Sequence, residues 1–145
     1  VDFVLTFEEL MGLFEAKEVN FAELPDNPED AFHSASADAR GFATSGGVAQ
    51  AVVNAIKKMD PDREVKVASA QGLAECKKLM TMAKAGKYNG YLLEGMACPG
   101  GCIAGAGTLA DPAKSIAMLN KYKAEAEMKV ATETPFQDSL DLLHY

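Results

Sequence analysis

The chain has 145 residues, 48% of them hydrophobic, and a formal net charge of −7, which suits one buried core better than two. Nucleic acid is not expected as a partner, because the Lys and Arg residues are scattered among carboxylates instead of forming a basic patch. Membrane insertion is not expected either, since no apolar run is long enough to cross a bilayer and no leader pattern opens the sequence, which indicates a cytoplasmic protein.

The first forty residues predict a strand, a helix and a long loop. Residues 2–6 form a β-branched and aromatic run typical of a core strand, and Thr6 and Glu9 match a capping box that opens a helix. Residues 19–42 have neither a helical nor a strand period, which predicts a long loop that belongs to a site or packs against a missing partner. Because Val1 opens directly on the predicted strand, we expect the chain to be a piece of a longer parent.

A helix and a strand–helix–strand unit follow. The helix opens at residues 44–47, and its apolar side chains recur every four residues, which predicts deep packing. These side chains are Val48, Val52 and Ile56. Residues 64–94 then have the pattern of two strands joined by a helix, a length that suits a parallel crossover.

The last third of the chain predicts two more helices. Asp111 and Pro112 have the order of an N-cap and a first helical residue, and they open a long amphipathic helix. Its apolar positions are Ile116, Leu119, Tyr122, Ala126 and Val130. A second start pattern at residues 134–137 leads into a short helix with Leu140 and Leu143.

These elements predict an α/β fold. We expect one domain over residues 1–145, with a small, mainly parallel sheet flanked by helices. Residues 111–145 would form a C-terminal helical extension of that domain.

Two cysteines lie just after the last predicted strand, in a loop rich in glycine. Cys98 and Cys102 follow the carboxyl end of that strand, where open parallel sheets commonly place ligands. Pro99 fixes one backbone torsion, while Gly100 and Gly101 permit conformations closed to other residues, so both sulfurs can point inward. Such a loop also lets backbone N–H groups approach an anionic iron–sulfur centre, and it therefore predicts a metal or cluster site.

The spacing of the two cysteines by itself leaves other interpretations open. Three intervening residues are also compatible with an incidental pair, a local disulfide or half of a zinc site. Zinc is disfavoured because no second Cys or His pair completes a tetrahedron: Cys76 falls on the apolar face of a helix, and His33 and His144 lie far apart in sequence. We expect Cys76 to be a buried core residue.

The motif around the cysteines is more specific than their spacing. Residues 94–107 read Glu-Gly-Met-Ala-Cys-Pro-Gly-Gly-Cys-Ile-Ala-Gly-Ala-Gly and resemble the last of three cysteine motifs in the FeFe (iron-only) hydrogenase family. Residues 42–48, Phe-Ala-Thr-Ser-Gly-Gly-Val, resemble that family's Phe-Gly-x-Thr-Gly-Gly-Val segment, and residues 2–13 resemble the stretch after its second cysteine motif. The likeness covers nearly the whole chain and points to the carboxy-terminal part of the H-cluster domain of the large subunit.

The resemblance implies an oxidoreductase that reversibly oxidises dihydrogen to protons and electrons at an H-cluster, a 4Fe-4S cluster joined to a two-iron subcluster. Cys98 and Cys102 would be the metal ligands, and no residue of this chain is expected to be catalytic by itself. The cofactor-binding residues would be Gly46, Gly47, Met96, Pro99, Gly100 and Gly101. Met96 among them would form an apolar wall against the cluster.

The other two cysteine motifs of the family are absent, so the resemblance implies a fragment that holds half of a composite site. We expect the fragment alone to be inactive and to bind no cluster; its partners would be the remainder of the parent chain and a ferredoxin-like electron carrier. The chain departs from the family at residues 105–109, Gly-Ala-Gly-Thr-Leu in place of Gly-Gly-Gly-Gln-Pro, and at Gln50, where glutamate is usual. The alternative is a hydrogen-sensing or iron–sulfur assembly protein of the same fold, which binds a cluster without turnover.

Overall fold

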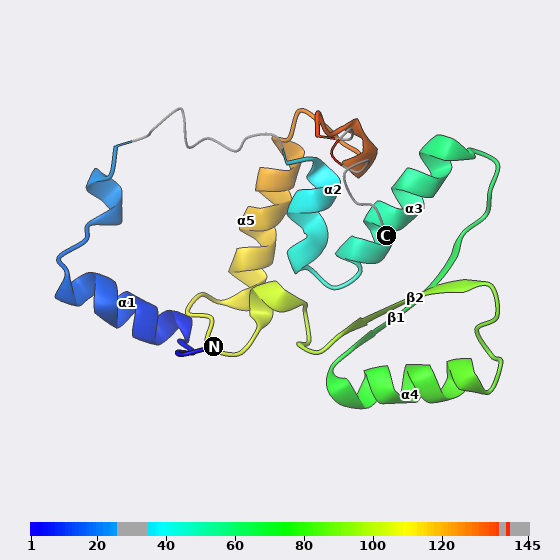
Figure 1. Cartoon of the computed structure of the whole chain (residues 1–145), viewed down its shortest axis with the longest axis horizontal. Coiled ribbons are helices and arrows are strands. Elements are labelled where there is room, and N and C mark those ends of the chain that lie inside the picture. The colour runs from blue at the N-terminus through cyan, green and yellow to red at the C-terminus, as the bar shows by residue number, and fades with distance from the viewer. Residues whose placement is uncertain (26–34, 137–138, 140–145) are drawn as a thin grey trace.

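A computed structural model describes residues 1–25, 35–136 and 139 and shows an α/β architecture (Figure 1). Its helices and strands within those residues are α1 (Phe7–Ala16), α2 (Ala37–Arg40), α3 (Gly47–Met59), β1 (Lys66–Gln71), α4 (Leu73–Lys84), β2 (Tyr91–Met96) and α5 (Pro112–Ala124). Short 3₁₀ helices connect them: η1 (Phe21–Glu23), η3 (Gly41–Ala43), η4 (Cys102–Ala104) and η5 (Ala131–Glu133). The predicted fold class, a parallel sheet flanked by helices, is confirmed.

β1 and β2 form a two-stranded parallel sheet in the described part of the chain, and α4 is the crossover between them. The register places Gln71, the last residue of β1, opposite Met96, the last residue of β2. Gly72 turns the chain from β1 into α4, and its N–H donates to the Met96 carbonyl at 2.8 Å. The unit predicted over residues 64–94 is therefore present, and it brings the carboxyl ends of both strands to the same place.

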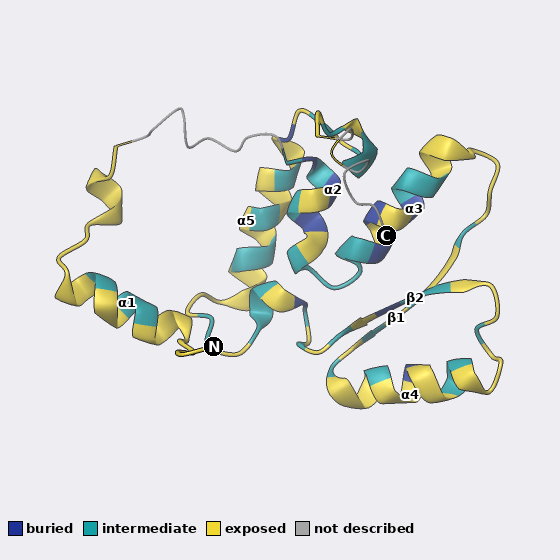
Figure 2. Cartoon of the chain, in the orientation of Figure 1, coloured by how far each residue is buried: buried dark blue, intermediate teal, exposed yellow. Residues whose placement is uncertain are grey.

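The buried part of the chain is small and centres on α3 (Figure 2). The buried hydrophobic residues that the structure describes are Ala49, Ala51, Val53, Leu79 and Ala126. α2 packs against both α3 and α5. Arg40 links α2 to α5, because its guanidinium lies 3.9 Å from the Tyr122 ring centroid and Nη1 donates to the Tyr122 carbonyl at 2.7 Å. α2 thus joins α3 and α5.

The strand predicted at residues 2–6 is wrong, because these residues form no strand. Val1 and Phe3 are 112% and 87% exposed. A β-branched run becomes a strand only where a neighbouring strand satisfies its backbone groups, and the described chain pairs it with none. The capping box that follows is confirmed: Thr6 Oγ1 accepts from Glu9 N at 3.2 Å, and Glu9 Oε2 accepts from Thr6 N at 2.8 Å.

The long loop predicted over residues 19–42 is only partly correct. Residues 26–34, which include His33, lie outside the described part of the chain, but the remainder contains η1 and the short helix α2. Ser36 caps α2, since its Oγ accepts from Ala39 N at 3.1 Å. A helix of four residues has no apolar period, so the sequence pattern could not reveal it.

α3 forms where it was predicted, but its packed face differs. The buried positions of the helix are Ala49, Ala51 and Val53. The predicted face, Val48, Val52 and Ile56, is half-buried or exposed, and Val52 is 37% exposed. α3 packs against α2 and η3. Two of its three buried residues are alanines, whose small side chains allow the neighbouring elements to approach closely.

α5 begins at Pro112 with Asp111 as its N-cap, as predicted. It ends at Ala124 and does not continue to Val130. Past this end, the Lys129 ammonium donates to the Ala124 carbonyl at 3.2 Å and to the Ala126 carbonyl at 2.6 Å, and so satisfies acceptors that a helix end leaves unpaired.

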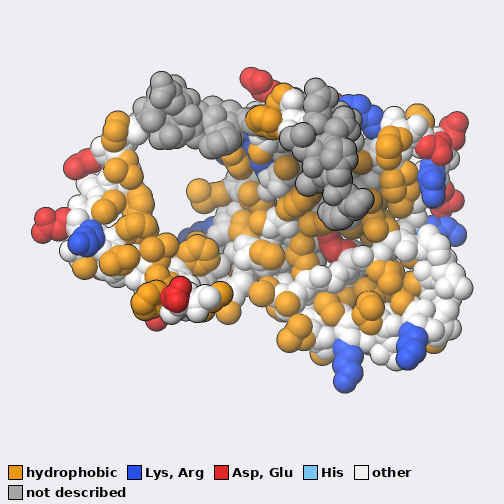
Figure 3. All heavy atoms as spheres, viewed as in Figure 1, with side chains coloured by type: hydrophobic (Ala, Val, Ile, Leu, Met, Phe, Trp, Pro, Cys, Tyr) orange, Lys and Arg blue, Asp and Glu red, His pale blue; other side chains and the backbone are white. Residues whose placement is uncertain are grey.

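The short helix predicted with Leu140 and Leu143 lies outside the described residues, as does His144. Of the helices that are described, none has the length and apolar character that crossing a bilayer requires. Hydrophobic side chains are nevertheless numerous on the surface, over the strands and along α1 in the view of Figure 3. Much apolar area of this chain is therefore exposed to solvent.

Glu133 joins η5 to α3 through hydrogen bonds. Its Oε2 accepts from Lys129 N at 2.7 Å and from Val130 N at 3.1 Å, and its Oε1 accepts from Lys58 Nζ at 3.2 Å. The backbone N–H groups of Val130 and Lys129, followed by the Lys58 ammonium, lower the pKa of Glu133 from 4.5 to about 2. The folded state therefore favours the ionised carboxylate.

Glu133→Gln should weaken the fold at neutral pH. Since the folded pKa of about 2 lies below the ordinary 4.5, the carboxylate stabilises the fold fully above pH 4.5, and this contribution is lost as the pH falls towards 2. We expect the variant to have a lower thermal midpoint at pH 7 and a smaller loss of stability between pH 4.5 and 2. Circular dichroism melts of the full chain measure both. Glu64→Gln removes an exposed carboxylate as a control, and equal effects of the two changes at pH 7 would contradict the role of Glu133.

Candidate metal-binding site

The loop with Cys98 and Cys102 directly follows the end of β2. Gly101 N donates to the Cys98 carbonyl and Gly105 N to the Cys102 carbonyl, both at 3.0 Å, so the chain coils through two successive turns. Gly100 and Gly101 have φ values of 88° and 100°, in the left-handed region that residues with side chains rarely adopt. Cys98 is half-buried, Cys102 is exposed, and both thiols are free. The glycines thus give the loop the curled path predicted for it, but the exposed Cys102 is not enclosed as expected.

Gly100 holds the loop in place through both of its backbone groups. Its N–H donates to Gln71 Oε1 at 2.6 Å, and its carbonyl accepts from Ser45 N at 3.1 Å. Gln71 is the last residue of β1, and Ser45 lies in the turn before α3. Three segments that are far apart in sequence therefore meet at the cysteine loop.

The turn before α3 packs against the cysteine loop without room for side chains. A Cβ atom at Gly101 would lie 2.5 Å from backbone atoms of Ala43 and Ser45. A Cβ atom at Gly47 would overlap the Gly41 carbonyl oxygen. The structure thus brings the two predicted glycine pairs into neighbouring turns.

Glu94 was not predicted as a site residue, but its carboxylate joins β2 to the start of α3. Although only 8% of the residue is exposed, Oε2 accepts from Gly46 N, and Oε1 accepts from Ala49 N at 2.9 Å. The first amides of a helix lack partners within it, and their partial positive charge favours an anion. The available sequence signal was an acidic residue in the otherwise uncharged strand β2.

The remaining predicted residues lie around the loop. Met96 is half-buried at the end of β2, and Pro99 is exposed in the loop, 3.8 Å from where a Cβ of Gly72 would lie. Cys76 is half-buried on α4, with Sγ 3.5 Å from the Met96 carbonyl oxygen and 3.7 Å from the Ala70 carbonyl oxygen. The Cys76 thiol therefore faces the sheet, but the residue is only half-buried and does not belong to the buried core in which it was expected.

The two thiols are the metal-binding groups that the loop offers. Within the described residues, no group of three or more His, Cys, Asp or Glu side chains could hold a metal ion. Two thiolates cannot close a zinc tetrahedron, and a 4Fe-4S cubane takes four. A Cβ at Gly105 would lie 3.0 Å from the Cys102 carbonyl oxygen, a tight approach, and 3.5 Å from Cys98 Sγ, an ordinary contact, so Gly105 packs directly against both cysteines. Two thiolates in a glycine-rich loop therefore fit one part of an iron–sulfur site.

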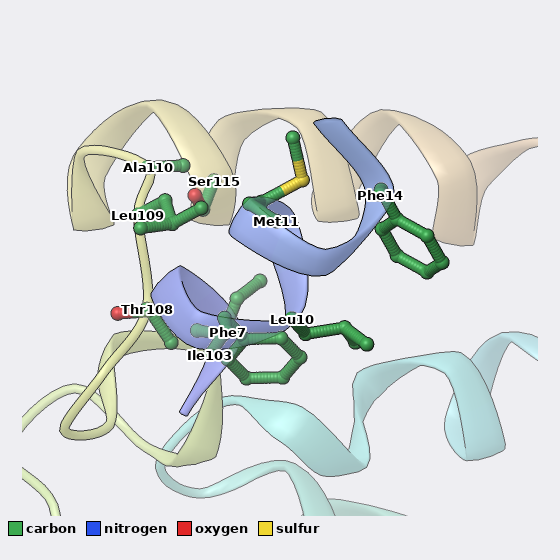
Figure 4. Close-up of a pocket in the computed structure, with 9 residues that line it drawn as sticks. All are labelled: Phe7, Leu10, Met11, Phe14, Ile103, Thr108, Leu109, Ala110 and Ser115. Atoms are coloured by element: carbon green, nitrogen blue, oxygen red, sulfur yellow. The ribbon is translucent and has the colours of Figure 1, made fainter. Parts of the chain in front are cut away.

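An apolar pocket of about 330 Å³ lies beside the loop, between α1 and the chain that follows Cys102. Its lining residues are Phe7, Leu10, Met11, Phe14, Ile103, Thr108, Leu109, Ala110 and Ser115. Figure 4 shows Phe7 of α1 beside Ile103, the residue next to Cys102. The lining contains no carboxylate, ammonium or imidazole, so the pocket offers apolar surface but no acid–base group.

Comparisons with known proteins agree on one family. The family model described as "Iron only hydrogenase large subunit, C-terminal domain" matches residues 1–106. The chain is 31% identical over 134 residues to the periplasmic Fe hydrogenase large subunit of Nitratidesulfovibrio vulgaris, covering 74% of this chain and 32% of that protein. It is 33% identical over 134 residues to the NADP-reducing hydrogenase subunit HndD of Solidesulfovibrio fructosivorans, covering 74% of this chain and 23% of that protein.

The fold is also similar to a solved structure, a variant of the FeFe-hydrogenase HydA1 from Chlamydomonas reinhardtii. The TM-score is 0.60 at 22% identity, and the match covers 99% of this chain and 51% of that one. The chain thus spans about a third and about a quarter of the curated relatives it matches, and about half of the solved chain.

Gly101→Ala should destabilise the fold. The added methyl group would meet backbone atoms at 2.5 Å and hold an L-residue at a φ of 100°, so we expect the free energy of unfolding to fall by about 2–4 kcal/mol. Gly12→Ala in α1 is a matched control, because nothing lies within 4 Å of a Cβ there and helix propensity should raise stability by about 0.5–1 kcal/mol. Urea unfolding of the full chain measures both, and similar values for the two variants would refute the close approach at Gly101.

Proposed function

Because this chain belongs to the family of C-terminal domains of iron-only hydrogenase large subunits, we propose that Cys98 and Cys102 are two thiolate ligands of an H-cluster. The observation that carries the proposal is the curled cysteine loop after β2, fixed at Gly100 by Gln71 and Ser45. The H-cluster would supply the redox chemistry, the reversible oxidation of dihydrogen to protons and electrons. This activity would belong to the intact parent, an oxidoreductase.

The chain's own groups would bind and enclose the cluster. The left-handed Gly100 and Gly101 keep Cβ atoms away, so that backbone can approach an anionic cluster closely. Met96 would contribute an apolar, polarizable side chain, and Gly46 and Gly47 would place bare backbone next to the two-iron unit. Pro99 would restrict the path of the loop between the two ligands. No acid–base residue of this chain is proposed for the reaction.

The site would be completed by the remainder of the parent chain. Most of each curated relative lies beyond the part that this chain matches, and two thiolates are half of the ligands that a cubane takes. We therefore expect this chain to be inactive alone, and the parent to exchange electrons with a ferredoxin-like carrier. A cytoplasmic location stays a prediction, since one relative is named as periplasmic.

The departures from the family pattern do not crowd the cysteines. Ala106 is exposed, so its methyl group is accommodated, and the flanking Gly105 and Gly107 retain the positions where a Cβ would meet other atoms. Gln50 is also exposed, and its amide donates to Asn54 Oδ1 at 2.8 Å, one turn further along α3. The substitutions at Ala106 and Gln50 therefore give no steric argument against cluster binding, and a hydrogen-sensing or iron–sulfur assembly protein stays the alternative to an enzyme.

Iron and acid-labile sulfide analysis of this chain, expressed anaerobically, tests the composite site. We expect no stoichiometric cluster, because two thiolates leave half of a cubane's ligand positions unfilled. The double variant Cys98→Ser, Cys102→Ser measures adventitious iron under the same conditions. Stoichiometric iron and sulfide on the wild-type chain, absent from the double variant, would show that these residues hold a cluster unaided.

In the intact parent, Cys98→Ser or Cys102→Ser should abolish hydrogen oxidation and lower the iron content, because a hydroxyl is a harder and weaker iron ligand than a thiolate. Cys76→Ser is the matched control, since the Cys76 thiol faces the sheet, and it should keep both iron and activity. Hydrogen-dependent reduction of a dye and iron analysis provide the measurements. Equal loss of iron in the Cys76 and Cys98 variants would refute the ligand assignment.

A further inference from the structure

Glu94 is the one charged residue of strand β2. It is 8% exposed, while the preceding Leu92 and Leu93 are half-buried. Burying a carboxylate costs free energy unless hydrogen bonds replace its water, and a hydrophobic side chain of similar size would avoid that cost. Such a residue is best explained by the geometry that its hydrogen bonds impose.

Both carboxylate oxygens of Glu94 are occupied by the start of α3. Oε2 accepts from Gly46 N and Oε1 from Ala49 N, a pairing that spans the N-cap and the first turn of the helix. Two acceptors on one rigid carboxylate fix the helix end in both position and direction, and the helix dipole favours the same arrangement. β2 and α3 are therefore joined at one defined point.

The contact continues from this point to the cysteine loop. Ser45, the neighbour of Gly46, donates its N–H to the Gly100 carbonyl at 3.1 Å, and Gly101 is packed against the backbone around Ser45. Gly100 is held on its other side by Gln71 at 2.6 Å. Any shift of the α3 end would thus move one of the two supports of Gly100.

We propose that Glu94 is a positioning residue: its buried carboxylate fixes the turn before α3 and thereby the path of the loop that carries Cys98 and Cys102. The inference rests on the proposed function for its purpose, because a preset loop would hold both thiols ready for one cluster. The hydrogen bonds that carry it lie within this chain and can be tested without a cluster.

Glu94→Gln tests the proposal in the full chain by amide hydrogen exchange followed with NMR. The amide side chain keeps one acceptor but turns an N–H₂ donor towards a backbone N–H, so one of the two bonds is lost. We expect exchange at Ser45, Gly46 and Ala49 to accelerate by about tenfold or more, with the amides of α4 unchanged. Glu64→Gln, which removes an exposed carboxylate, should change none of these rates.

The alkylation rate of the cysteines separates positioning from general support of the fold. With iodoacetamide, the half-buried Cys98 should react severalfold faster in Glu94→Gln, while Cys76, packed against the sheet, should react at its wild-type rate. Equal acceleration at both cysteines would mean that Glu94 only stabilises the fold as a whole. Faster exchange at Gly46 with no change at Cys98 would mean that the effect stops at α3. Either result overturns the proposal, as does no change at all.

The wild-type chain keeps the proposal testable if Glu94→Gln does not fold. Slow exchange of the Ser45, Gly46 and Ala49 amides would support it, and exchange as fast as in an unstructured peptide would overturn it. Failure of the proposed function would appear elsewhere, as retained iron in the cysteine variants of the parent, and would leave these exchange and alkylation results unaffected.

Discussion

The parallel register of β1 and β2 brings the ends of both strands together at the cysteine loop. Because Gln71 pairs opposite Met96, the Gln71 side chain is placed beside the chain that leaves β2, where it accepts from Gly100 N. A slip of one residue would turn the Gln71 side chain to the other face of the sheet and leave that N–H without its partner. Glu94 lies opposite Ser69 in this register, two residues before the end of β2, and its carboxylate accepts from Gly46 N and Ala49 N at the start of α3. The strand pair thus carries Gln71, which holds the cysteine loop directly, and Glu94, which holds the turn before α3 that contains Ser45.

A sheet of two parallel strands is not self-sufficient. Parallel sheets normally have helices on both faces and further strands at their edges, whereas α4 is the crossover helix of this pair and Val67 and Tyr91 are 39% and 38% exposed. The five buried hydrophobic residues in the described chain include three alanines, and apolar side chains are prominent on the face in Figure 3. So much exposed apolar surface is typical of a surface that packs against another part of a protein. In the proposed function, the remainder of the parent chain would cover this surface.

Features that depend on neighbouring residues could be predicted from the sequence, and features that depend on distant partners could not. The capping box of Thr6 and Glu9, the start of α5 at Asp111 and the crossover unit all follow from spacing within a few residues. The prediction of a strand at residues 2–6 was wrong because a strand requires a pairing partner, and a local sequence pattern does not show whether one exists. The prediction of the packed face of α3 was wrong because that face contains the small residues Ala49 and Ala51, which allow close packing. Hydrophobic periodicity does not measure how closely helices can pack.

The site shows the same division. The conformational freedom of Gly100 and Gly101 was predicted from residue type alone, since only their backbone freedom was at issue. The role of Glu94 depends on partners 45 and 48 residues away, and no local pattern encodes that distance. An acid in an otherwise uncharged strand was nonetheless a conflict between residue type and predicted environment, and such conflicts tend to occur where a fold serves a site. In this chain two backbone amides, those of Gly46 and Ala49, donate to the Glu94 carboxylate. The thiols could therefore be oriented by contacts already present within this chain, even if the other cluster ligands come from elsewhere.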